Sequence, residues 1–147
     1  MKHLIISLFL ILSLQSCNTD DCGDCFTPPQ PFLFELVDKS TGENAFTNGT
    51  YEPQQLNILD SITTAPVEYE FISENNVNLI QLNTIGWKTE TVNLSFEISG
   101  NQIFNFYVDA TRKKENCCSF TTYNAIELEG AEFEIAPNSG IHTILLN

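Results

Sequence analysis

The sequence predicts an all-β fold, a single antiparallel β-sandwich of about seven to nine short strands. Residues 91–98 (TVNLSFEI) alternate polar and apolar side chains without a break, which is the pattern of a strand with one buried face. Further runs rich in β-branched and aromatic residues recur about every eight to twelve residues along the chain. No window sustains the apolar period of about 3.6 residues that an amphipathic helix requires over three turns.

The individual strands follow from these runs. We expect strands at residues 32–38, 55–59, 67–73, 77–83, 91–98, 102–110, 120–128, 131–135 and 141–146. In 102–110 one face carries the apolar residues Phe104, Phe106, Val108 and Ala110. Turn-forming residues separate the runs, at 39–43, 48–49, 74–76, 130 and 137–140. The short segment 99–101 (SGN) predicts a hairpin between 91–98 and 102–110, and 52–55 is compatible with one short helical turn.

The chain divides into a leader, a tether and one folded domain. Lys2 and His3 precede an apolar stretch at 4–14, which as a helix would span about 17 Å. That length is too short to cross a hydrocarbon core of about 30 Å, so residues 1–16 are predicted to be a signal peptide. Residues 26–31 (FTPPQP) favour an extended Pro-rich spacer. We therefore expect the tether at 17–31 and the sandwich at 32–147.

The leader ends in Leu14-Gln15-Ser16-Cys17, with a branched apolar residue three positions before a cysteine and a small residue directly before it. This arrangement resembles the lipobox of bacterial lipoproteins. The resemblance implies cleavage before Cys17 and attachment of diacylglycerol, with acyl chains such as palmitate, to its thiol. A multiply acylated terminus would hold the domain on a membrane. The alternative is a cysteine that merely ends an ordinary signal peptide.

Three carboxylates, Asp20, Asp21 and Asp24, follow the lipobox directly. Such an acidic run resembles the surface-export signal of lipoproteins in Bacteroidetes-type bacteria, which implies the outer membrane and exposure at the cell surface. As a mere solvated linker it would be compatible with a periplasm-facing domain. A calcium loop is a third alternative, but the spacing of the acids fails the EF-hand pattern.

Two wider resemblances bear on the class of protein. The whole chain resembles small uncharacterised lipoproteins of flavobacterial type, for which no activity is implied. Residues 34–43 (FELVDKSTGE) resemble the first hairpin of transthyretin-like or prealbumin-like sandwich modules, and an immunoglobulin-like sandwich is the alternative. The net charge of -13, from 6 Lys+Arg and 19 Asp+Glu, argues against nucleic acid and anionic lipid as partners.

Four cysteines follow Cys17, and in an exported protein an even number predicts disulfides. The candidates are Cys22, Cys25, Cys117 and Cys118. We favour crossed bridges between the two pairs, with the adjacent cysteines placed in a bend that the polar stretch 112–116 supplies. The alternatives are self-closed pairs, thiol redox chemistry at the C-x-x-C of Cys22 and Cys25, and a zinc site.

The sequence contains none of the common catalytic motifs, and His142 is the single histidine after the leader. We expect His142 on the half-solvated face of its strand, in a structural role. Trp87, in a loop, with Tyr107 and Tyr123 beside it, is the candidate ligand site. The alternative for Trp87 is a cap on the core.

The function expected is a non-catalytic binding or accessory module at the cell envelope, with a glycan or an envelope protein as partner. No enzyme activity, cofactor or metal is expected. The alternatives are an assembly lipoprotein without a small ligand and a thiol redox protein.

Overall fold

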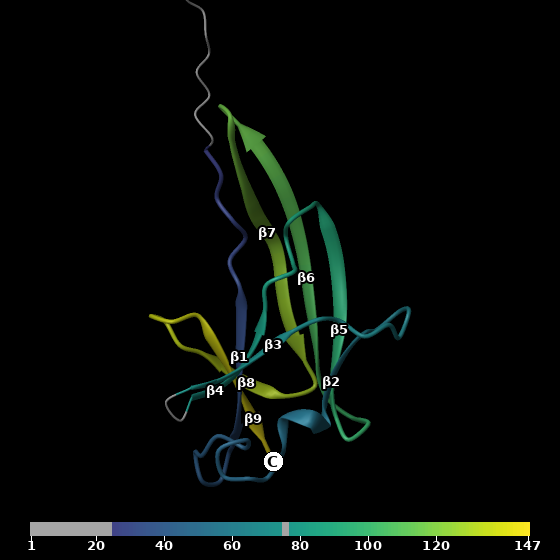
Figure 1. Cartoon of the computed structure of the whole chain (residues 1–147), viewed down its shortest axis with the longest axis vertical. Coiled ribbons are helices and arrows are strands. Elements are labelled where there is room, and N and C mark those ends of the chain that lie inside the picture. The colour runs from purple at the N-terminus through teal and green to yellow at the C-terminus, as the bar shows by residue number, and fades with distance from the viewer. Residues whose placement is uncertain (1–24, 75–76) are drawn as a thin grey trace, which may run out of the picture.

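Strands dominate the described part of the chain and form two sheets, which confirms the predicted β-sandwich. The computed structural model describes residues 25–74 and 77–147 (Figure 1). The first sheet has the order β3 (Glu70–Glu74), β4 (Val77–Leu82), β1 (Phe32–Asp38), β9 (Ile141–Leu146) and β8 (Glu132–Ile135). The second has the order β2 (Leu56–Asp60), β5 (Glu90–Ile98), β6 (Asn101–Glu115) and β7 (Cys118–Glu129). The helical turn expected at 52–55 is the 3-10 turn η1 (Pro53–Gln55).

Each predicted strand segment contains a strand, and β1 and β9 have the predicted bounds. β3 begins later than expected, at Glu70 instead of residue 67. The reason is that the amide of Val67 donates to the carbonyl of Ile58 on β2, at 2.8 Å. The residues before β3 therefore still belong to the other sheet, and the chain crosses between the sheets at 68–69.

One strand pair departs from the antiparallel arrangement of the predicted sandwich. β1 and β9 run parallel, in a register from Leu33 opposite Ile141 to Asp38 opposite Leu146. The two strands lie at opposite ends of the folded chain, so no tight turn between them imposes an antiparallel arrangement. All other named strand pairs of the described residues are antiparallel.

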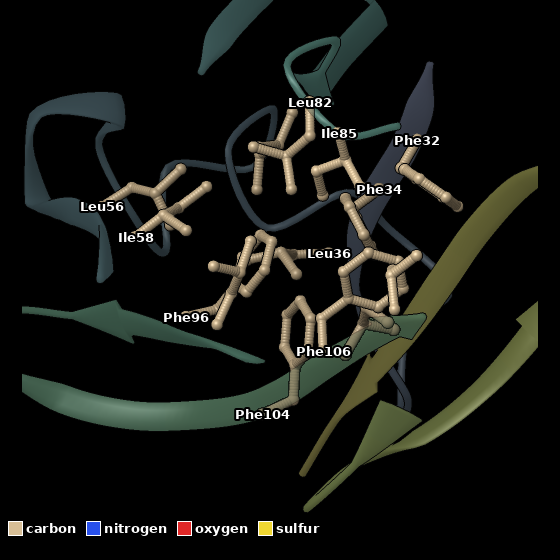
Figure 2. Close-up of a cluster of buried hydrophobic side chains, with 14 of the residues drawn as sticks. Phe32, Phe34, Leu36, Leu56, Ile58, Leu82, Ile85, Phe96, Phe104 and Phe106 are labelled. Atoms are coloured by element: carbon tan, nitrogen blue, oxygen red, sulfur yellow. The ribbon is translucent and has the colours of Figure 1, made fainter. Parts of the chain in front are cut away.

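Phenylalanine side chains from both sheets fill the centre of the core (Figure 2). Phe34 of β1 is fully buried, and its ring lies 4.9 Å from Phe96 and 4.9 Å from Phe106, between ring centroids. Phe96 and Phe104 stack at 4.2 Å across the β5–β6 hairpin. The predicted inward face of β6 is confirmed, because its alternate residues are all buried: Phe104, Phe106, Val108 and Ala110.

β6 and β7 form one long hairpin that extends well past the core (Figure 1). We predicted that residues 112–116 would form a bend, but 112–115 continue β6, paired with β7 from Cys118 onwards. The turn is only Asn116 and Cys117, with φ of 46° and 72°. Positive φ at both central residues is typical of the tight turns that match strand twist, so the polar run stays extended up to the turn.

Candidate functional site

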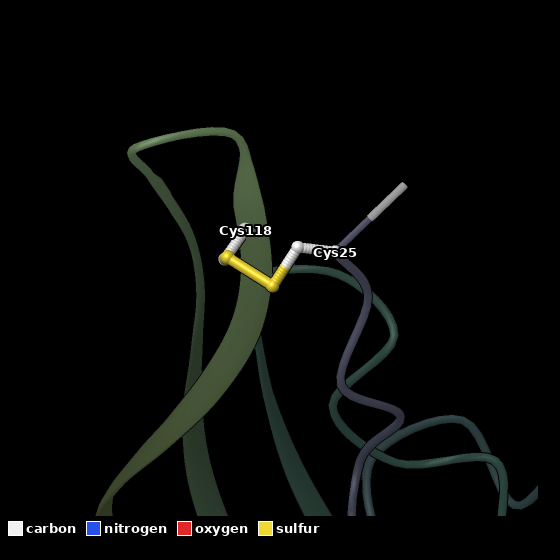
Figure 3. The surroundings of a disulfide bond; sticks show 2 residues. All are labelled: Cys25 and Cys118. Atoms are coloured by element: carbon white, nitrogen blue, oxygen red, sulfur yellow. A yellow bond between two sulfur atoms is a disulfide. The ribbon is translucent and has the colours of Figure 1, made fainter. Parts of the chain in front are cut away.

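A disulfide joins the start of the described chain to the far end of the long hairpin. Cys25 and Cys118 are bonded with an S–S distance of 2.09 Å and are 93 residues apart in sequence (Figure 3). This bridge is one of the crossed pairings expected. Cys117 is disulfide-bonded as well. The predictions for Cys17, Cys22 and the acidic run fall outside the described residues.

The segment after Cys25 lies against β7 and is not a free spacer at this point. The amide of Thr27 donates to the carbonyl of Ser119 at 2.8 Å, and the amide of Ser119 donates to the carbonyl of Cys25 at 3.0 Å. Phe26 thereby pairs with Ser119 in a parallel bridge. Together with the disulfide, these bonds hold the Phe26 side chain in a defined place beside the hairpin.

The loop 83–89, between β4 and β5, carries Trp87 to the same place. Ile85 is buried in the core and anchors the loop. Gly86 has φ +92°, and a Cβ there would meet the Tyr123 hydroxyl at 2.9 Å. The indole Nε1 of Trp87 donates to the carbonyl of Asn83 at 2.7 Å. Glycine is therefore required at position 86, and the Trp87 ring is oriented by its own loop.

Phe26 and Trp87 stack on one another, with ring centroids 5.8 Å apart and an angle of 24° between their planes. We call these two side chains the Phe26–Trp87 pair. Both remain about half exposed, Phe26 at 54% and Trp87 at 51%. Trp87 was expected either to bind a ligand or to cap the core. The structure places it outside the core, with one aromatic partner and a large accessible surface.

Arg112 of β6 binds the tether segment to the hairpin. Its guanidinium carbon lies 4.9 Å from the centre of the Phe26 ring, within range of a cation–π contact. Its Nη1 donates to the carbonyl of Thr27 and to the hydroxyl of Thr121, both at 2.9 Å. Its Nη2 is buried and has no hydrogen-bond partner among the described residues. Arg112 and Phe26 were missed by the sequence analysis, because only the long-range pairing of 25–27 with β7 brings them to Trp87.

The two tyrosines expected beside Trp87 lie in different places. Tyr123 is adjacent: its hydroxyl donates to the carbonyl of Gln30 at 3.4 Å, and its ring packs edge-on against Phe32. Burial raises the pKa of Tyr123, so the hydroxyl stays protonated at neutral pH. Tyr107 lies on the outer face of the second sheet, where it lines a polar depression with Asn93, Asn105, Glu127 and Glu129. The expectation that Tyr107 flanks Trp87 is therefore wrong, because alternate residues of β6 face opposite sides of the sheet.

His142 also lies elsewhere than expected. We predicted a half-solvated face, but the side chain points into the sandwich and is only 8% exposed. Its ring packs against Phe34 and Phe106, and its Nδ1 lies 3.3 Å from the carbonyl oxygen of Leu33. Burial lowers the pKa of His142, although the contact with Leu33 opposes this effect. The structural role expected for this residue fits its position.

Within residues 25–74 and 77–147, no three His, Cys, Asp or Glu side chains converge to hold a metal ion. In the same part of the chain, no helix has the length and apolar character to cross a membrane. Comparison with known proteins finds no family, no curated protein and no solved structure that matches this chain.

Proposed function

We propose that this protein is an exported lipoprotein, acylated at Cys17, that acts as a non-catalytic binding module at the bacterial outer membrane, with a neutral glycan as its ligand. The observation that carries the proposal is the half-exposed Phe26–Trp87 pair. The Trp87 indole stacks on Phe26 with one face, and the half of its surface that stays exposed offers an apolar area of the size of a sugar ring. The C–H face of a pyranose packs on such a surface, while its hydroxyls remain in water.

The pair is rigid enough to select a ligand, because both rings are fixed before a ligand arrives. A disulfide and two backbone hydrogen bonds hold the segment of Phe26, and a hydrogen bond to Asn83 orients the indole of Trp87. Preorganised rings lose little conformational entropy on binding. The strongly negative chain favours a neutral glycan over an anionic one.

Two observations support the proposed localisation in the cell envelope. The Cys25–Cys118 bridge suits an oxidising compartment such as the periplasm or the cell surface. Cys17 of the lipobox lies nine residues before Phe26, so an acylated Cys17 would keep Phe26 within about 32 Å of the bilayer surface. Surface exposure through the acidic run at 20–24 is part of the same proposal, with a periplasm-facing domain as its alternative.

The glycan proposal is tested by intrinsic fluorescence, because Trp87 is the single tryptophan of the chain. Titration with neutral oligosaccharides should shift the Trp87 emission in a saturable way. Replacing Phe26 by alanine should abolish the shift, whereas replacing Tyr107, on the other side of the molecule, should leave it unchanged. If no neutral oligosaccharide changes the emission at millimolar concentration, the glycan proposal fails.

The proposed acylation of Cys17 and the localisation are tested separately, in cells. Mass spectrometry of the membrane fraction should find a mature chain that begins at an acylated Cys17, and Cys17→Ala should leave the leader uncleaved. Protease added to intact cells should degrade the domain if it is exposed at the surface and spare it if it faces the periplasm. A mature chain without acyl groups would contradict the lipoprotein proposal.

An assembly lipoprotein without a small ligand is the second candidate function. Exposed apolar side chains on two edge strands, Ile126, Phe133 and Ile135, favour it. The thiol redox alternative has less support, because it requires Cys25 to pair with Cys22, and in the structure Cys25 is bonded to Cys118.

A further inference from the structure

One side of the sandwich is bordered by two edge strands, β7 and β8. In the described part of the chain, β7 ends the order of one sheet and β8 ends the order of the other. Gly130, with φ of 92°, lies in the short connection between them. Figure 1 shows that β8 begins near the lower end of β7 and then runs away from it. An edge strand presents unpaired backbone N–H and C=O groups, which are able to accept another strand.

Apolar side chains on these two strands face the inside of the sandwich but stay accessible. Ile126 of β7 pairs with the buried Val108 and is 40% exposed. Phe133 of β8 pairs with the buried Ile144 and is 41% exposed, and Ile135, next but one along β8, is 54% exposed. Each side chain therefore lies one strand further out than a core residue, at the open side of the core.

The opposite faces of the same two strands are acidic. Glu127 and Glu129 alternate with the inward residues of β7, and Glu132 and Glu134 alternate with those of β8. Lys39 binds Glu132 at 2.7 Å, and it is the one ion-pair partner that the described residues provide for these four carboxylates. Both edges thus combine an apolar inner face with a negatively charged outer face.

We propose that the edge of β8 binds an extended segment of a partner protein in which apolar and basic residues alternate. Side chains of an added strand would point alternately to the two faces of the sheet. Apolar ones would cover Phe133 and Ile135, and basic ones would lie beside Glu132 and Glu134 on the outer face. Strand addition of this kind takes its affinity from main-chain hydrogen bonds and its specificity from alternate side chains.

A second copy of this chain fits the edge poorly. Pairing β8 with β8 of another molecule would bring Glu132 and Glu134 next to the same residues of the partner. Like charges on directly opposed residues destabilise a strand pair. Charge complementarity therefore selects a basic segment from a different protein.

The test uses a capped ten-residue peptide of alternating valine and lysine, added to the isotopically labelled mature chain. Amide chemical shifts should change along β8 and the end of β7, and binding should weaken as the salt concentration rises. An alternating valine–glutamate peptide and a block peptide of five valines followed by five lysines are the controls. We expect both control peptides to bind at least about tenfold more weakly than the valine–lysine peptide.

Matched variants distinguish binding at the β8 edge from nonspecific binding elsewhere on the protein surface. Ile135→Ser should weaken binding of the valine–lysine peptide about tenfold, whereas Ile62→Ser, which removes an 85% exposed isoleucine from a distant turn, should not. Glu134→Gln should weaken binding and reduce its salt dependence, whereas Glu74→Gln, on the opposite edge strand β3 of the same sheet, should do neither.

Four results would overturn the proposal. These are the absence of binding at millimolar peptide, equal binding of the valine–glutamate peptide, shifts centred on the Phe26–Trp87 pair, and a dimer of the protein that Ile135→Ser abolishes. The last would show that the edge binds a second copy. The glycan proposal is tested independently, by the emission of Trp87 with oligosaccharides. Of the four results, only shifts centred on the Phe26–Trp87 pair would also concern the glycan site.

Discussion

Replacing Gly86 by alanine tests whether the tether segment is packed against the Trp87 loop as the structure has it. A Cβ at this position would lie 2.9 Å from the Tyr123 hydroxyl, 3.0 Å from Cγ2 of Thr121 and 3.3 Å from Cβ of Pro29. Gly42→Ala is the matched control. Gly42 also has a positive φ, +74°, but nothing lies within 4 Å of its Cβ position.

The expected magnitudes follow from these two environments. In Gly42→Ala only the backbone conformation is unfavourable, which costs about 1–2 kcal/mol of unfolding free energy. Gly86→Ala adds an overpacking cost of about 1–3 kcal/mol. The Tyr123 ring is unable to move away freely, because it packs against Phe32. Gly86→Ala should therefore destabilise the protein by about 2–5 kcal/mol, clearly more than the control.

Urea unfolding, followed by Trp87 fluorescence and by circular dichroism, measures both variants. In the Gly86→Ala background, Tyr123→Phe removes the closest atom and should recover about 0.5–1 kcal/mol, while in the wild type it should have little effect. Equal destabilisation by Gly86→Ala and Gly42→Ala would refute the reasoning. So would the absence of coupling between positions 86 and 123.

Three further predictions concern the core, the disulfide and pH. Phe34→Ala should destabilise the protein by about 3–5 kcal/mol in urea unfolding, and a cost below about 1 kcal/mol would contradict the central place of this ring. Reduction of the Cys25–Cys118 bridge together with any neighbouring one should cost at most about 4–5 kcal/mol, the chain-entropy value for a 93-residue separation. Unfolding with and without reductant measures this cost, and no difference between the two would refute it. The pKa of His142 is lowered on folding from 6.5, so the unfolded state binds its proton more readily. Its contribution is therefore fully present above pH 6.5 and declines as the pH falls below that value. The wild type should lose more stability than His142→Gln between about pH 7.5 and pH 5.5, and an equal loss would contradict the burial of a neutral imidazole.

The strands could be predicted because their signal is local. Alternation in 91–98 and 102–110, and the short Gly-containing segment 99–101 between them, predict the β5–β6 hairpin without reference to the rest of the chain. The same reasoning placed Trp87 in a loop. The long-range bridge of Cys25 was favoured on other grounds, the even number of cysteines in a chain expected to be exported. The resemblance to transthyretin-like modules and the lipoprotein address stay predictions, because no contact of the described residues depends on them.

The candidate site could be predicted only in part. Tyr123 does lie beside the Trp87 loop, but Tyr107 does not, because it lies on the face of β6 opposite to the apolar one, as the alternation in 102–110 already indicated. The place of Tyr123 on β7 could not be predicted in this way. The bulge between Asp109 and Ala110 changes the pairing of β6 with β7, and this change decides which residues of β7 face inward beyond it. A local pattern contains no information on such a shift of register.

The sequence by itself therefore determined the class of fold, the position of nearly every strand, and the inward face of β6, because these depend on the alternation of side chains along one strand. Only the tertiary structure decided that β1 and β9 run parallel, that Phe26 and Arg112 join Trp87, and that the edges of β7 and β8 border one open side of the core. Each of these features joins segments far apart in the chain. Their pairing depends on packing and loop closure across the whole domain, which no local window of sequence records.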